Sequence, residues 1–282
     1  MITGYSLLAP SLIGVVFFLL FPVLIVIWLT FQHWDLISPI RFVGLANYRS
    51  VLSDPIFGNS LLVTAGFVLI VIPIQTGLGL FVATMLTRGL PGSMVMRTIY
   101  VLPWISAPLA LGVVWKWIFA PTGGALNAIL GVNIAWLSDL NLALPSVATV
   151  VIWTNVGYVT LFFMAGLLNI PDQILEAAEL DGASPMVIFW RVKLPLLRPT
   201  MFFVLVTSLI SVFQIFDQVY AMTQGGPLHR TDVIASRIYF EAFQAFDLGR
   251  AAVMAIVLLV ILVVITLAQQ LYFNRKTTYD LS

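Results

Sequence analysis

A short charged segment between two long apolar stretches holds the residues whose types and spacing could do chemistry. It opens with Glu176-Ala177-Ala178 and Gly182, and it closes with Val192-Lys193-Leu194-Pro195. The Glu176 carboxylate can pair with a basic residue of a partner, and the two alanines let another backbone approach closely. These properties would suit a rigid knob that transmits force between proteins. From composition alone, an ordinary polar loop that caps two helices is the favoured interpretation.

Local patterns predict a helix-turn-helix for this segment. Pro171 can start a helix, and the acidic residues after it suit the positive end of the helix dipole. Gly182 tolerates a positive φ and can therefore end that helix. Ser184 can cap a second helix, which Pro195 and Pro199 are expected to break.

A second set of polar residues lies inside apolar stretches. Those that recur at intervals of four, three and four are Thr207, Ser211, Gln214 and Gln218. This spacing predicts one face of a helix, with Asp217 beside it. Amides and aromatic faces can bind a neutral polar molecule, whereas an ion would need concentrated charge. The candidate residues of a substrate path are Trp153, Asn155, Tyr158, Ser211, Gln214, Asp217 and Gln218.

The composition of the 282-residue chain indicates that membrane spans position these residues. Hydrophobic residues make up 61% and charged residues 9% of the chain, and the mean hydropathy is +1.05. Soluble domains carry about 25% charged residues, so an ordinary soluble domain is excluded. The apolar runs reach about 20 residues, the length of a membrane-crossing helix, whereas the strands of a membrane barrel would alternate over roughly 10 residues.

Six apolar segments are predicted to cross the membrane as helices. Their approximate bounds are 6–31, 61–86, 98–119, 144–168, 200–222 and 251–273. The first is too long for a signal peptide core and is expected to remain as a span. Pro103 and Pro108 lie in the third and are expected to kink it. The predicted fold class is therefore an all-α, polytopic membrane bundle of six helices in a single domain, 1–282.

The sequence offers no catalytic or metal-binding motif. No glycine-rich phosphate loop precedes any lysine, so the chain is not expected to hydrolyse ATP itself. Cysteine is absent, and His33 and His229 stand alone without ligand spacing, so no metal site is expected. An intramembrane hydrolase would need two converging catalytic groups within spans, and the predicted spans contain neither a histidine nor a second acidic residue. A stand-alone ion-coupled secondary transporter is the alternative function, and it would have only Asp217 for ion coupling.

The charged segment resembles the EAA loop of permease subunits in binding-protein-dependent ABC importers. That loop reads EAA-x3-G-x9-I-x-L-P, and only Val192 departs from it, as a conservative replacement of isoleucine. Residues 170–171, 181–183 and 194–199 look like the sugar-importer branch in particular. The similarity extends to residues 42–48, 223–227 and 242–249, so the resemblance covers nearly the whole chain. The Gly-Gly-Pro tripeptide at 225–227 resembles the maltose and glycerol-3-phosphate type of first permease subunit.

The resemblance implies an ABC importer permease fold and a role in ATP-driven import of a sugar or sugar derivative. The implied partners are a second homologous permease, a dimer of cytoplasmic ATPase subunits that binds ATP and Mg, and an extracytoplasmic solute-binding protein. No cofactor and no nucleic acid is implied for this chain itself. Residues 170–199 would be a cytoplasmic coupling loop, with both termini cytoplasmic, in the cytoplasmic (inner) membrane of a bacterium or archaeon. The implied ATPase contacts are Glu176, Ala177, Ala178, Asp181, Gly182, Val192, Leu194 and Pro195.

Overall fold

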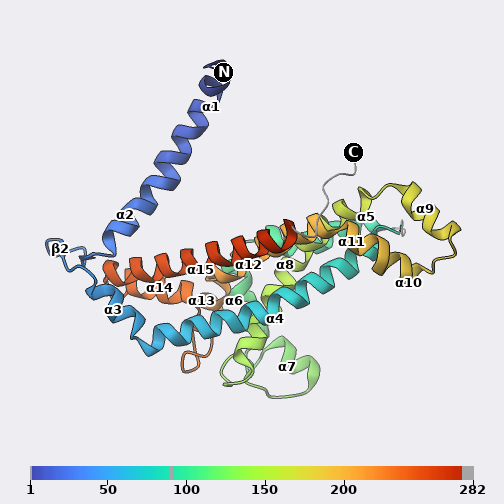
Figure 1. Cartoon of the computed structure of the whole chain (residues 1–282). Helices are drawn as coiled ribbons and strands as arrows, with labels where there is room; N and C mark the ends of the chain where they lie inside the picture. Colours follow the sequence, from blue (N-terminus) through green and yellow to red (C-terminus); the bar gives the residue numbers. More distant parts are fainter. Residues whose placement is uncertain (1, 89–91, 275–282) are drawn as a thin grey trace.

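The computed structural model describes residues 2–88 and 92–274, and helices dominate that part of the chain (Figure 1). Within these described ranges, five helical segments are long and apolar enough to cross a bilayer, and there are up to six if one bent pair of helices counts as a span. The five segments are Leu8–Leu29, Pro55–Leu86, Ala143–Leu168, Arg198–Met222 and Leu248–Phe273. The predicted all-α membrane bundle is confirmed. Among the described residues, the only strands are the antiparallel pair β1 (Gln32–His33) and β2 (Arg41–Phe42).

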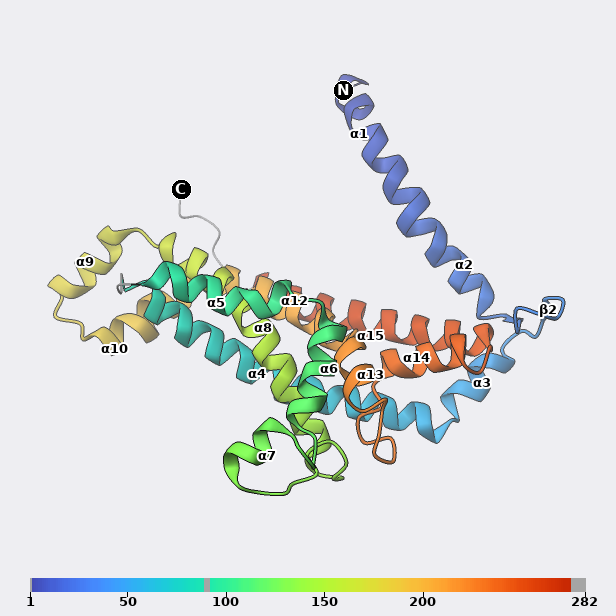
Figure 2. The same ribbon diagram turned by 180° about the vertical axis from the view of Figure 1, so that it is seen from behind.

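The N-terminal apolar helix stands away from the rest of the molecule (Figures 1 and 2). It consists of α1 (Ile2–Val15), a π-helical turn η1 (Val16–Leu20) and α2 (Phe21–Leu29). In its most apolar window, 0% of the residues are buried against the described chain. A helix that is apolar on all sides needs lipid or another protein as cover. This span therefore belongs to a surface that the single chain does not complete.

The crossing of α4 (Pro55–Leu86) and α8 (Ala143–Leu168) forms the centre of the bundle. A Cβ atom built on Gly79 would lie 2.5 Å from Cγ1 of Val159, and Val159 is fully buried. Small residues permit such close backbone approach, which matters inside a membrane because packing replaces the hydrophobic effect between helices. Gly79 therefore sets how closely α4 and α8 approach.

Charged side chains tie together the end of the bundle that carries β1 and β2. The other helices at this end are α3 (Ala46–Leu52), α14 (Ile234–Phe243) and α15 (Leu248–Asn274). Arg250 lies 2.7 Å from Asp54, which caps α4, and 3.1 Å from Glu241. Arg237 pairs with the same Glu241 at 2.7 Å. Buried charges are stable only when paired, so this network fixes α14 and α15 to the start of α4.

The third predicted span, 98–119, is not a single helix. It consists of α5 (Ser93–Ile105) and α6 (Pro108–Ile118), whose axes differ by 98°. Pro108 is the first residue of α6, and Ala107 before it has the extended backbone that a following proline favours. The expected kink is therefore a full break.

The fifth predicted span, 200–222, also contains a break. α12 (Arg198–Phe213) is followed by the separate helix α13 (Asp217–Met222). α13 packs on α6, where a Cβ atom on Gly112 would lie 2.6 Å from the Cβ atom of Ala221. The prediction of one continuous polar face through this span is wrong, because the polar residues before and after the break belong to different helices.

The remaining helices lie in the two largest connections. Their bounds are Ala125–Leu130 for α7, Asp172–Leu180 for α9, Pro185–Ile188 for α10, Phe189–Lys193 for the π-helical η2 and Leu194–Leu196 for α11. α7 lies in a loop between α6 and α8 that projects from the side of the bundle. The connection that contains α9 and α10 projects from the end opposite to β1 and β2 (Figures 1 and 2).

Replacing Gly79 with alanine is expected to lower the melting temperature of the purified protein, because the added Cβ would overlap the Val159 side chain. Gly77→Ala is the matched control on the same helix, since nothing lies within 4 Å of a Cβ atom there. Alanine favours a helix over glycine by about 1 kcal/mol, so the control should keep or raise the melting temperature. Equal shifts of the two variants in thermal unfolding would contradict a tight crossing.

Candidate functional site

The loop between α8 and α12 is a helix-turn-helix, as predicted, and its turn has a defined hydrogen-bond pattern. α9 begins one residue after the predicted start. Gly182 has a φ of +79°, and its N–H donates to the Glu179 carbonyl at 2.9 Å. The N–H of Ala183 donates to the Ala178 carbonyl at 3.0 Å. This pair of bonds around a left-handed glycine is a Schellman motif, which fixes the direction of the chain after α9.

The second helix of the loop is less regular than predicted. Ser184 occupies the N-cap position of α10, although its side chain makes no capping hydrogen bond. Val192 lies in the π-helical η2, and Leu194 and Pro195 lie in α11. The expected break at Pro195 is wrong, because helical backbone continues without interruption from Pro185 to Leu196, through the π-helical turn that precedes this proline. The turn instead falls at Leu197, directly before α12.

The loop presents charged and apolar side chains at one end of the molecule. Glu176 and Ala177 are exposed. Leu180 is 89% exposed and Trp190 is 59% exposed. Large apolar side chains held outward by a rigid turn mark an interaction surface. The residues for which ATPase contact stays a prediction all lie on this loop, namely Glu176, Ala177, Ala178, Asp181, Gly182, Val192, Leu194 and Pro195.

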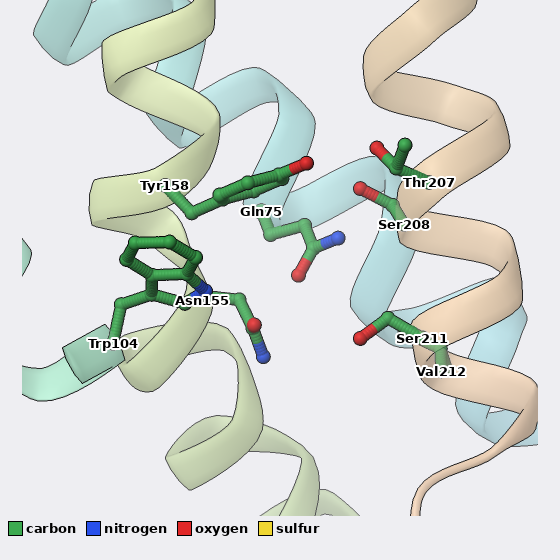
Figure 3. Close-up of a pocket in the computed structure, with 8 residues that line it drawn as sticks. All are labelled: Gln75, Trp104, Asn155, Tyr158, Thr207, Ser208, Ser211 and Val212. Atoms are coloured by element: carbon green, nitrogen blue, oxygen red, sulfur yellow. The ribbon is translucent and has the colours of Figure 1, made fainter. Parts of the chain in front are cut away.

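A cavity of about 230 Å³ lies between α4, α5, α8 and α12 (Figure 3). The residues that line it are Gln75, Trp104, Asn155, Tyr158, Thr207, Ser208, Ser211 and Val212. Two amides, three aliphatic hydroxyl groups and two aromatic side chains therefore meet inside an apolar bundle. Such groups can orient a neutral polar molecule through hydrogen bonds and stacking.

Contacts along the cavity wall hold several of these side chains in place. The rings of Trp104 and Tyr158 have centroids 5.0 Å apart. Asn155 and Thr207 each donate a hydrogen bond to a carbonyl of their own helix, both at 2.9 Å. Gln75 reaches the same space from α4 (Figure 3). The lining is therefore built by side chains from four helices rather than by one loop.

The structure brings three of the seven predicted path residues into this cavity. Asn155 and Tyr158 line it from α8, and Ser211 lines it from α12. Trp153 lies elsewhere, with its ring edge-on to Trp115 at a centroid distance of 5.3 Å. The contact of these residues with cargo stays a prediction.

The other three predicted path residues follow the break in the fifth span. Gln214 is the exposed C-cap residue of α12, and Asp217 is the half-buried first residue of α13. Gln218 is buried, and its Cα lies 3.5 Å from the Cβ position of Gly112 on α6. None of the three lines the cavity between α4, α5, α8 and α12. Their contact with cargo also stays a prediction.

Sequence reasoning missed Gln75, Trp104 and Ser208. A signal for Gln75 was present, because an amide deep inside an apolar span needs a hydrogen-bond partner or a polar cavity. Trp104 carried no such signal, since its position follows from the break between α5 and α6. Ser208 lies one residue after Thr207, and only the packing of α12 decides which of the two hydroxyl groups is buried.

Comparison with known proteins gives concordant results. The model of the family described as binding-protein-dependent transport system inner membrane component matches residues 75–279. The sn-glycerol-3-phosphate transport system permease protein UgpA of Agrobacterium fabrum is 36% identical over 99% of this chain and 97% of its own length. The probable ABC transporter permease protein YesP of Bacillus subtilis is 35% identical over 94% of this chain and 88% of its own length.

Solved structures share the fold. A chain of a bacterial ABC transporter involved in the import of the acidic polysaccharide alginate has a TM-score of 0.84 and 21% identity, and the match covers 98% of this chain and 96% of that chain. A chain of the MetNI methionine ABC transporter has a TM-score of 0.59 and 17% identity, over 79% of this chain and 97% of that chain. The chain therefore belongs to the family of binding-protein-dependent transport system inner membrane components, multi-pass permeases of ABC importers.

Proposed function

We propose that the chain is one of two permease subunits of an ATP-driven importer for a sugar or sugar derivative, coupled to a cytoplasmic ATPase through residues 170–199. The connectivity around the cavity carries this proposal. α8 carries Asn155 and Tyr158, α12 carries Ser211, and the loop joins the end of α8 to the start of α12. Force applied to the loop would therefore reach two walls of the cavity.

The surface of the chain supports the proposed partners. The uncovered N-terminal helix offers a second permease an apolar face along Leu8–Leu29. The exposed Glu176 and Leu180 offer an ATPase a charge and an apolar contact. In this proposal the ATPase dimer binds ATP and Mg, and the loop and both termini are cytoplasmic. A solute-binding protein would deliver cargo at the opposite end, outside the cytoplasmic membrane of a bacterium or archaeon.

The names of related proteins support the cargo class. The relative from Agrobacterium fabrum is named for sn-glycerol-3-phosphate, and the transporter with the same fold is described as importing alginate. One alginate transporter structure includes a periplasmic protein bound to an alginate pentasaccharide. A sugar or sugar derivative is therefore the cargo that we infer here.

Changing Glu176 to lysine is expected to weaken the complex with the ATPase, because the reversed charge would repel a basic partner residue. We expect the amount of co-purified ATPase and the ATP-driven uptake to fall at least about tenfold, the change produced by about 1.4 kcal/mol of lost binding. Glu179→Lys makes the same charge change on α9 outside the motif, and it should keep most of both activities. If both variants bind ATPase and transport as the unmodified chain does, the coupling role is wrong.

Changing Gly182 to alanine is expected to loosen the coupling loop without a steric clash. The position has a φ of +79° and open space around its Cβ, so the cost comes from the left-handed backbone, about 1 kcal/mol for a residue with a side chain. Asparagine tolerates this conformation better and is the matched control. Hydrogen exchange of residues 172–196 should rise more in Gly182→Ala than in Gly182→Asn. The same exchange in both variants would argue against a turn that depends on this glycine.

A further inference from the structure

Two polar atoms in the cavity wall have no hydrogen-bond partner among the residues that the structure describes. They are Oε1 of Gln75 and Oγ of Ser208. Gln75 is 2% exposed and Ser208 is 4% exposed, so bulk water does not reach most of either residue. Figure 3 shows the two side chains extending from α4 and α12 toward the same space. More than about 90% of buried polar groups are hydrogen-bonded, so this pair points to a bound molecule.

The other polar groups of the lining differ from this pair. Asn155 and Thr207 already donate to carbonyls of their own helices. Gln75 keeps an amide carbonyl that needs a donor, and Ser208 keeps a hydroxyl group that can donate or accept. A hydroxyl group of a ligand both donates and accepts, so it can satisfy both residues. A carboxylate or a fully ionised phosphate group only accepts, so it could not itself donate to the Gln75 carbonyl.

The electrostatics of the lining also disfavour an anion. None of the described residues that line the cavity carries a formal charge, and α4 and α8 contain no Asp, Glu, Lys or Arg. The nearest cations along α5 and α12 are Arg97 and Arg198, seven residues from Trp104 and nine from Thr207. At about 1.5 Å of rise per residue, they lie roughly 10 Å and 13 Å away along their helices. An anion in this cavity would therefore find no positively charged partner on this chain, which is unfavourable inside a membrane.

We propose that Gln75 and Ser208 are specificity-determining residues that select a neutral, hydroxyl-bearing cargo and reject phosphorylated or carboxylated ones. This inference rests on the proposed transport function, and it goes beyond it by naming the charge class of the cargo. Trp104 and Tyr158 supply the stacking surface for such a molecule, and the carbonyl of Gln75, on α4, accepts a hydrogen bond from one of its hydroxyl groups. The cargo class thus differs from a phosphate ester such as sn-glycerol-3-phosphate.

The test uses the assembled importer, in which this chain is co-expressed with its second permease, its ATPase and its solute-binding protein. Proteoliposomes that contain ATP are given radiolabelled neutral sugars (glucose, maltose and cellobiose) or the anions sn-glycerol-3-phosphate and glucuronate. We expect uptake of a neutral sugar and no uptake of either anion. Gln75→Leu should reduce the initial rate of neutral-sugar uptake at least about tenfold at subsaturating sugar, chiefly through a higher KM.

Two control variants separate this role from a general effect of removing buried polar groups. Thr76→Val removes an unpartnered buried hydroxyl group from the next residue of α4, which does not line the cavity. Ser236→Ala is the corresponding control for Ser208→Ala, since Oγ of Ser236 is also unpartnered but lies on α14. Both controls should transport as the unmodified chain does. The yield and melting temperature of each assembly show whether a variant has folded.

The outcomes distinguish the inference from the function on which it rests. Uptake of an anion in preference to the neutral sugars would overturn the inference and leave the importer function intact. Neutral-sugar uptake that falls equally in Gln75→Leu and Thr76→Val would overturn the assignment of Gln75. Failure of the ATPase to co-purify, together with no ATP-dependent uptake of any probe, would overturn the proposed function and the inference with it.

Discussion

The close crossing of α4 and α8 is the constraint on which the rest of the structure depends. Gly79 allows it, because its missing side chain leaves room for Val159. Gln75 lies four residues before Gly79, and Asn155 lies four residues before Val159, so each amide is one helical turn from the contact. The two amides face one cavity because the crossing is tight. A wider crossing would separate them and admit lipid.

Two helices that line the cavity, α8 and α12, also lead directly into the exposed loop. At the loop end of α8, a Cβ atom on Gly166 would lie 2.8 Å from the Leu197 side chain and 2.5 Å from Oγ1 of Thr200. The loop is therefore held tightly where it leaves and re-enters the bundle. Rigid packing at the base and a Schellman turn at Gly182 suit a loop that moves as a body. The breaks in the third and fifth spans add boundaries at which helices can move separately.

Hydropathy predicted where the spans lie, because about 20 apolar residues have few alternatives to crossing a bilayer. The turn at Gly182 and the interruption at Pro108 were also predictable, because a glycine with positive φ and a proline that starts a helix act on the local backbone. No proline or glycine between residues 200 and 222 signals the break between α12 and α13, which reflects packing of α13 on α6. The sequence therefore placed Gln214 and Gln218 on one helical face, which the break prevents. The position of Gln75 in the cavity wall depends on how α4 crosses α8, which the sequence of α4 alone does not reveal.

The most direct test of the account is the side of the membrane on which the loop lies. The chain contains no cysteine, so Leu180→Cys and Ile37→Cys each give a single site, and the native residues are 89% and 92% exposed. Leu180 ends α9 and Ile37 lies between β1 and β2, and these elements lie at opposite ends of the molecule (Figure 1). A membrane-impermeant maleimide should label Leu180→Cys only in inside-out vesicles stripped of ATPase, and bound ATPase should protect it. Ile37→Cys should be labelled only in right-side-out vesicles. Labelling of Leu180→Cys from the outside, or no protection by ATPase, would contradict the account.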